Sequence, residues 1–332
     1  MDIQTIFEKF LENTVNLNKG RVERIEDAQR ILTDFIKSCE DFKNLYIDTI
    51  PQGSFRQKTI IKPVGNSGTF DIDLLIKLKE NLDWTASNYH ARLAKAFKDS
   101  GTYEDITDTN GKTRCVTIDY KGDFHVDLVP GVEREGGIFI CNKNTDEFEA
   151  TDGDGYAQWF EQQDVMANGY LVPVVRLIKY LRDSREEFDT KSIILTTIAG
   201  MQVRPSENFS SLPHALSTIL TRMNEFLYQF ESAPSIPNPA MHGENFNRHW
   251  KNDSKGFSKL KAAIGTYADI SDNAIATSDT EEAIESWQEL FGEDFFNDDT
   301  DKGNTPSNNP PQSPSTGPVI VNRSPAQPWC NV

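Results

Sequence analysis

The sequence predicts an α+β fold in which a mixed α/β half precedes a helical half and a disordered tail. Strand-like apolar runs alternate with helical periodicity up to about residue 153, and helical spacing dominates from there to about residue 297. Polar residues dominate beyond it. We therefore expect a core module with an N-terminal helix at residues 1–160, a helical lobe at 161–297 and a tail at 298–332.

The first half combines a long helix with several strands. Apolar residues recur every three or four positions from Val22 to Ile36, which predicts a helix with one buried stripe. The Lys121-Gly122 link predicts an antiparallel hairpin between the strands on either side of it. A short helix is expected at 55–58 and a longer one at 87–100, with Ser87 as its N-cap. Strands are expected at 70–76, 115–120 and 123–129.

The second half is predicted to be helical. Three prolines between Ser232 and Pro239 predict an extended loop. From about Asp298 the chain has little to bury, which predicts disorder. Trp329 leaves two interpretations of this tail open, a floppy end or a short peptide that anchors in a partner's pocket. Helices are expected at 156–163, 171–187, 192–203, 213–230, 256–268 and 280–291.

Charge and composition exclude several classes of protein. The chain has 34 Lys and Arg against 51 Asp and Glu, a net charge of −17, which disfavours a broad nucleic-acid-coating surface. No apolar run approaches the roughly 20 residues of a membrane helix, and the acidic N-terminus does not resemble a signal peptide. The four cysteines form no C-x-x-C pair, which argues against a structural zinc site or a disulfide framework. We expect a cytoplasmic protein without a membrane partner.

Three carboxylates carry the chemical prediction. Asp71 and Asp73 lie two apart on an expected strand, so their side chains leave the same open face of the sheet, and Asp127 follows the same logic on a later strand. Adjacent carboxylates repel, and a hard divalent cation such as Mg²⁺ removes the conflict. Upstream, Gly53-Ser54 opens a short helix and offers a seat for phosphate.

Together these motifs resemble the nucleotidyltransferases of the DNA polymerase β-like superfamily. More narrowly, residues 1–296 are similar to the CD-NTases, bacterial relatives of cyclic GMP-AMP synthase and oligoadenylate synthase. The resemblance rests on QGSFRQKT at 52–59, FDID at 70–73 and HVDLVP at 125–130, with further matches in VVRLIKY at 174–180, FDTKS at 188–192, PNP at 237–239, ENF at 244–246 and SWQELFG at 286–292.

The resemblance implies a polymerase β-like core, a helical lobe and a cleft between them that holds the active site. In this family Asp71, Asp73 and Asp127 would hold two Mg²⁺ ions, for which Mn²⁺ can substitute, and Asp127 would help to deprotonate the attacking ribose hydroxyl. His125, on the same face, is expected to be a packed or surface residue. The residues that would bind the nucleotide are Gln52, Gly53, Ser54, Lys179 and Ser192.

The implied activity is synthesis of a cyclic di- or trinucleotide from nucleoside triphosphates, ATP among them, with release of pyrophosphate. The product would activate an effector in antiphage defence, and an operon partner would act on the C-terminal tail. Two alternatives stay open. One is a nucleotidyltransferase that modifies tRNA or protein as a toxin does, and the other is an inactive scaffold that binds nucleotides or partners.

Overall fold

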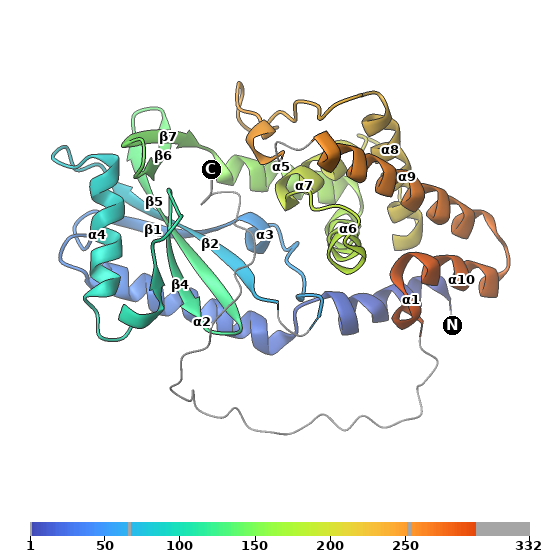
Figure 1. Ribbon diagram of the computed structural model, residues 1–332, viewed down its shortest axis with the longest axis horizontal. Helices are drawn as coiled ribbons and strands as arrows, with labels where there is room; N and C mark the ends of the chain where they lie inside the picture. Colours follow the sequence, from blue (N-terminus) through green and yellow to red (C-terminus); the bar gives the residue numbers. More distant parts are fainter. Residues whose placement is uncertain (1, 66–67, 251–253, 297–332) are drawn as a thin grey trace, which may run out of the picture.

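The computed structural model describes residues 2–65, 68–250 and 254–296. Figure 1 shows the strands grouped on one side of the molecule and helices α6 to α10 on the other. The predicted α+β fold is confirmed. The tail predicted at 298–332, with its peptide around Trp329, lies outside the described residues. None of the described helices has the length and apolar character needed to cross a membrane.

The strands of the described residues form one mixed sheet of seven strands in the order β1-β2-β5-β4-β3, with β6 paired to β5 and β7 paired to β6. Strands β2 and β5 are parallel, and the other pairs are antiparallel, including the predicted β4–β5 hairpin. The strands are β1 (Tyr46–Gln52), β2 (Phe70–Lys79), β3 (Thr107–Asp108), β4 (Val116–Tyr120), β5 (Phe124–Arg134), β6 (Gly137–Asn142) and β7 (Glu147–Thr151).

The helices of the first half are α1 (Ile3–Phe10), the π-helical turn η1 (Leu11–Val15), α2 (Lys19–Ser38), α3 (Gly53–Arg56), α4 (Ala86–Lys98) and the 3₁₀ turn η2 (Glu104–Ile106). Those of the second half are α5 (Gly153–Met166), α6 (Leu171–Arg185), α7 (Ser192–Met201), α8 (Leu212–Tyr228), η3 (Asn247–His249), α9 (Ser254–Ala276), α10 (Thr280–Phe291) and η4 (Glu293–Phe295).

Two large apolar cores account for this arrangement. Alternate residues of β2, β4 and β5 pack with the apolar stripes of α2 and α4, which cover one face of the sheet. The second core joins α5 to α10 and also takes in α1, whose Phe7 meets Trp287 edge-on with ring centroids 4.9 Å apart. The first helix therefore packs with the helical half, although the chain continues from it into the sheet. The domain boundary at residue 160 stays a prediction.

Three local expectations differ from the structure. Ser87 is not the N-cap of α4, because Thr85 occupies that position and Ser87 instead donates hydrogen bonds to Asp146. Helix α3 begins at Gly53 rather than at Phe55. Strands β1, β3, β6 and β7 were not expected: β1 contains a proline, β3 has two residues, and β6 and β7 begin with glycine and glutamate, which are depleted in strands.

Candidate active site

Strands β2 and β5 place the predicted acids side by side. They pair in register, with Asp73 opposite Asp127 and Asp71 opposite His125. Because side chains alternate between the two faces of a strand, Asp71, Asp73 and Asp127 leave the sheet on one face. Ile72, on the other face, is buried against the helices, as the sequence predicts. The parallel pairing thus brings together acids that lie more than 50 residues apart in the sequence.

Two of these carboxylates are buried, so the expectation that all three occupy an open face is wrong. Asp73 is 3% exposed and Asp127 is 0% exposed. Burial raises the pKa of both carboxyl groups, and for Asp73 the nearby charges of Asp127 and Asp71 raise the pKa further. Within the described residues, Oδ1 of Asp73 has no hydrogen-bond partner. This oxygen is therefore a buried acceptor that favours a cation.

Asp127 is engaged by the protein through both of its carboxylate oxygens. Thr117 donates a short hydrogen bond to Oδ1. Nζ of Lys112 lies 3.0 Å from Oδ2 and 3.3 Å from Oδ1. Across the part of the chain that the structure describes, no three His, Cys, Asp or Glu side chains are grouped as ready metal ligands. A metal at Asp127 would therefore lie next to the Lys112 ammonium group and the Thr117 hydroxyl.

His125 connects Asp71 to a second carboxylate. Its Nδ1 lies 3.1 Å from Oδ1 of Asp71, and its Nε2 lies 3.3 Å from Oδ1 of Asp119. Hydrogen bonds with Asp119 and Asp71 raise the pKa of His125 to about 9, against the opposing effect of burial. The His125 imidazole is therefore charged at neutral pH and lies between Asp71 and Asp119. Its packing agrees with the sequence-based expectation, but its partners do not follow from the sequence.

The turn from β1 into α3 approaches Asp73 closely. Gly53 has φ +59°, in the left-handed region that favours glycine. A Cβ at this position would lie 2.5 Å from Oδ2 of Asp73. Ser54 follows and lines a cavity, whereas Gln52 is not among the described residues that line it. The Gln52 side chain packs against Gly153, where an added Cβ would lie 1.8 Å from Oε1.

The cavity has a volume of about 630 Å³, within the range of small-molecule sites. One wall, which we call the acid wall, includes Gly53, Ser54, Asp71 and Asp73. The opposite wall, the cation wall, comes from α6, α7 and the segment between them. It includes Lys179, Arg182, Lys191 and Ser192, together with the acidic residues Asp183, Glu186 and Asp189. A cavity that holds both basic and acidic side chains suits a ligand that carries phosphate groups and cations.

Hydrogen bonds to the protein hold the cation wall in place. Nζ of Lys179 donates to the backbone oxygen of Thr59 at 3.0 Å and to its Oγ1 at 2.9 Å. Burial, and then the charge of Arg182, lower the pKa of Lys179 to about 7. Nη1 of Arg182 donates to Oγ of Ser192 at 2.9 Å, and Ser192 is the first residue of α7 rather than its N-cap. Lys179 and Ser192 therefore occupy the predicted cavity with protein partners already in place.

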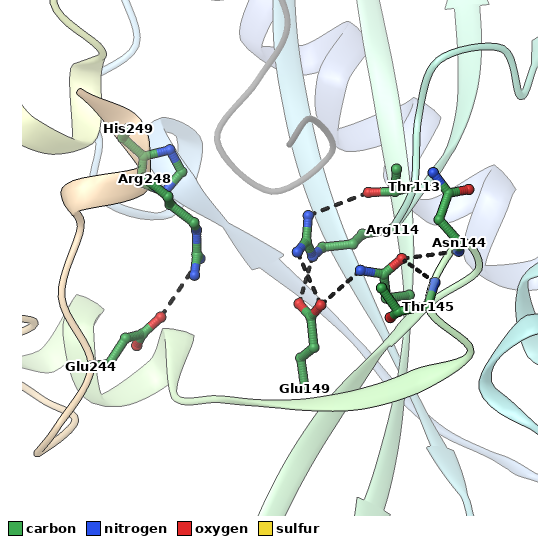
Figure 2. Close-up of polar contacts among 9 residues, drawn as sticks. Thr113, Arg114, Asn144, Thr145, Glu149, Glu244, Arg248 and His249 are labelled. Atoms are coloured by element: carbon green, nitrogen blue, oxygen red, sulfur yellow. Dashed lines mark hydrogen bonds and ion pairs between the residues drawn. The ribbon is translucent and has the colours of Figure 1, made fainter. Parts of the chain in front are cut away.

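A second polar network lies at the ends of β4, β6 and β7, and Figure 2 shows it. Arg114 donates to both carboxylate oxygens of Glu149, at 2.6 and 3.0 Å, and Asn142 donates to Glu149 at 2.7 Å. Burial raises the pKa of Glu149, but these hydrogen bonds lower it more, so that the pKa lies below its ordinary value. Figure 2 also shows a separate ion pair, in which Nη2 of Arg248 lies 3.6 Å from Oε1 of Glu244. The network fixes the base of the loop that carries Lys112.

Sequence reasoning missed three polar residues of the site. Lys112 belongs to an Asn-Gly-Lys turn, which by itself predicts only a loop. Thr59 was part of a matched motif, but no role was assigned to it. Arg182 lies three residues after Lys179, a spacing that places both side chains on one helical face, and this was the only available signal.

The chain is similar to several known proteins. Residues 1–164 match the model of the Second Messenger Oligonucleotide or Dinucleotide Synthetase domain. The c-di-GMP synthase of Roseivirga ehrenbergii is 27% identical over 277 residues, which cover 72% of this chain and 71% of the relative. The cyclic AMP-AMP-AMP synthase of an Acinetobacter strain is 24% identical over 306 residues, which cover 88% of this chain and 86% of the relative.

Solved structures share the fold over most of their length. The Vibrio cholerae DncV cyclic AMP-GMP synthase in complex with nonhydrolyzable GTP has a TM-score of 0.70 at 13% identity, covering 89% of this chain and 97% of that one. Escherichia coli MS115-1 CdnC with ATP has a TM-score of 0.66 at 21% identity, covering 90% and 99%. CdnC was also solved in a complex with HORMA-deltaN. These likenesses extend across both halves of the described fold.

Proposed function

Because the chain belongs to the CD-NTase family of second-messenger synthases, we propose that it is a Mg²⁺-dependent nucleotidyltransferase that joins nucleoside triphosphates into a cyclic di- or trinucleotide. Pyrophosphate is the second product. We further propose that the reaction takes place in the cytoplasm and serves antiphage defence through an effector that binds the cyclic product. A partner that acts on the C-terminal tail stays a prediction.

One observation carries this proposal. Asp71, Asp73, Ser54, Lys179 and Ser192 come from distant segments of the chain and line the same cavity. A triphosphate needs cationic and hydroxyl donors for its oxygens and carboxylates for its accompanying cations. The cavity offers both kinds of group on opposite walls.

The donor set suits a hard divalent cation. Asp71 and Asp73 supply carboxylate oxygens, and the unpartnered Oδ1 of Asp73 is an acceptor without a proton donor in the described structure. We expect these two residues and Asp127 to hold Mg²⁺, or Mn²⁺ in its place. When bound, the cations would neutralise the triphosphate and stabilise the charge that develops at the α-phosphate. The buried carboxylates would then carry their negative charges without mutual repulsion.

The residues of the chain would bind and orient the reactants. We propose that Ser54 donates its hydroxyl hydrogen bond to the outer phosphates and that Lys179 and Ser192 contact them from the cation wall. A ribose hydroxyl of the acceptor would attack the α-phosphate, and Asp127 would accept its proton. The nucleotide-binding role of Gln52 stays a prediction, since its side chain packs against Gly153.

Product analysis tests the proposal. Purified protein is incubated with Mg²⁺ and the four α-labelled triphosphates, and products are identified by mass spectrometry after phosphatase treatment. We expect a phosphatase-resistant cyclic oligonucleotide from the wild type and none from Asp71→Asn/Asp73→Asn. Label on added tRNA or on protein instead would support the alternative acceptors. Product from the double variant would contradict the assignment of these acids.

The single variant Asp73→Asn tests the fold as well as the site. The raised pKa of Asp73 means that its ionised form costs stability at neutral pH, so Asp73→Asn should stabilise the metal-depleted protein. We expect an increase in unfolding free energy of about 1–3 kcal/mol, the usual scale for one unsatisfied buried polar group. Urea unfolding in EDTA measures it. A stabilised but inactive variant separates loss of the site from loss of the fold.

A further inference from the structure

Lys112 lies where a cation of the proposed active site would have to act. Its Nζ is 3.0 Å from Oδ2 of Asp127 and 3.3 Å from Oδ1, and the Lys112 side chain is 17% exposed. Asp127 itself is 0% exposed. An ammonium group and a divalent cation held by the same carboxylate would lie close together and repel each other. Lys112 and a metal therefore compete for Asp127.

The loop that presents Lys112 is fixed at both ends. Residues 109–115 connect β3 to β4, and Lys143 holds this loop through two of its residues. Nζ of Lys143 donates to the carbonyl of Thr109 at 2.7 Å, and its backbone N–H donates to the carbonyl of Thr113 at 2.9 Å. These contacts hold the backbone of the loop on both sides of Lys112.

The network in Figure 2 anchors the same loop from its other side. Arg114, two residues after Lys112, is buried and makes a bidentate pair with Glu149, and its Nη1 donates to Thr113 at 3.3 Å. Such pairs are strong and geometrically specific. The loop that carries Lys112 is thus tied to Glu149 of β7, a strand with no residue among the described residues of the cavity wall.

We propose that Lys112 is a built-in competitor of the catalytic metal: it neutralises Asp127 before metal binds, and the metal must displace it. Two consequences follow. Lys112 stabilises a buried carboxylate that would otherwise be uncompensated. It also raises the concentration of divalent cation that the acid cluster needs, so that Asp127 joins the site only when metal is present to replace the ammonium group. This inference rests on the proposed metal-binding function of Asp71, Asp73 and Asp127.

The first test measures Mn²⁺ binding without nucleotide, by electron paramagnetic resonance of the free ion. We expect Lys112→Met to lower the dissociation constant about tenfold or more, the factor that one hydrogen bond to a charged group represents. Lys112→Arg should keep the wild-type constant. The matched control is Lys77→Met, because Lys77 pairs with Glu133 at 2.6 Å on the same sheet and should not affect metal binding. An unchanged or larger constant in Lys112→Met would overturn the proposal.

A second readout is the melting temperature, measured without and with metal. In EDTA, Lys112→Met leaves Asp127 buried without the lysine ammonium group. The melting temperature of this variant should therefore be about 5 °C or more below that of the wild type. Saturating Mn²⁺ should restore most of this loss, so that the metal-induced rise in melting temperature is larger than in the wild type. An equal rise in both proteins contradicts displacement of Lys112.

The third readout uses the wild type, so the inference remains testable if the methionine variant does not fold. The protein is chemically acetylated with and without Mg²⁺, and the extent of acetylation at each lysine is quantified by peptide mass spectrometry. Release from Asp127 should increase the acetylation of Lys112 severalfold, whereas that of Lys77 stays constant. Constant acetylation of Lys112 would overturn the proposal.

Failure of the proposed metal site is distinguishable from failure of this inference. If Asp71→Asn/Asp73→Asn binds Mn²⁺ as the wild type does, the metal site itself is wrong. If the double variant loses binding while Lys112→Met behaves as the wild type, only the competition by Lys112 is wrong.

Discussion

The acid wall and the cation wall of the cavity differ in whether their charged groups already have hydrogen-bond partners within the protein. On the acid wall, Asp73 is buried with an unpartnered oxygen and an aspartate beside it. On the cation wall, Lys179 and Arg182 already donate to backbone and hydroxyl oxygens of the protein. The acid wall keeps one buried carboxylate oxygen without a hydrogen-bond donor among the described residues, whereas Lys179 and Arg182 of the cation wall have acceptors without a ligand.

This difference indicates how ligand binding would be divided between the two walls. A cation at the acid wall relieves repulsion, so its binding gains free energy from the destabilised carboxylates. A phosphate at the cation wall meets Lys179 and Arg182 with several of their donors already engaged, so a contact that replaces a present partner contributes only the difference between old and new partners. We therefore expect changes at the acid wall to have the larger effects.

The largest effect is expected from Gly53→Ala, which breaks the acid wall without removing a charge. The new methyl group would collide with Oδ2 of Asp73, and the positive φ adds backbone strain. We expect synthesis to fall about a hundredfold or more, because a misplacement of about 1 Å has that effect. The matched control is Gly122→Ala, where φ is +79° and no atom lies within 4 Å. Equal activity of the two variants would contradict the close approach.

Lys179→Met should have an intermediate effect on the cation wall. The pKa of Lys179 is lowered to about 7 in the fold, so between about pH 7 and pH 10 the unfolded chain binds more protons and this lysine makes stability rise with pH. The methionine variant should lack that rise and show a KM for ATP about tenfold higher. Urea unfolding at several pH values and steady-state kinetics measure both.

Lys261→Met is the control for this experiment. Lys261 also donates to two backbone carbonyls, those of Tyr228 and Phe230, but it lies outside the cavity lining. Its replacement should leave the KM unchanged. A similar KM in both variants would mean that Lys179 serves only to hold Thr59.

The smallest effect is expected from Ser192→Ala. A neutral hydroxyl contributes about 0.5–1.5 kcal/mol, which corresponds to a KM about two- to tenfold higher. Ser217→Ala is the control, since the Ser217 hydroxyl bonds Asp272 within the helical half and should change stability only. An effect of Ser192→Ala as large as that of Gly53→Ala would remove the distinction between the two walls.

Much of the fold and part of the candidate site follow from short-range patterns in the sequence. The two-residue spacing of Asp71 and Asp73 places them on one face, and apolar periodicity predicts α2 and most helices of the second half. The Gly53-Ser54 turn is also predicted from a short local motif, because glycine often occupies backbone conformations that other residues avoid.

What the sequence does not predict depends on long-range packing. Burial of Asp73 and Asp127 comes from segments that cover them in space, and no local pattern reveals this. The pairing of Lys112 with Asp127 joins a surface-like turn to a core strand. Similarly, α1 packs against α10 at the far end of the described chain, and the sequence of α1 alone does not predict this contact.

The parallel register of β2 and β5 makes enzyme activity a sensitive report of correct folding. A slip of one residue would turn Asp127 toward the helices α2 and α4 and bring Val126 or Leu128 next to Asp73. Such a molecule would keep almost the same secondary structure and compactness, yet it would lack the third acid. The fraction of a purified preparation that is active therefore measures strand alignment, which circular dichroism does not resolve.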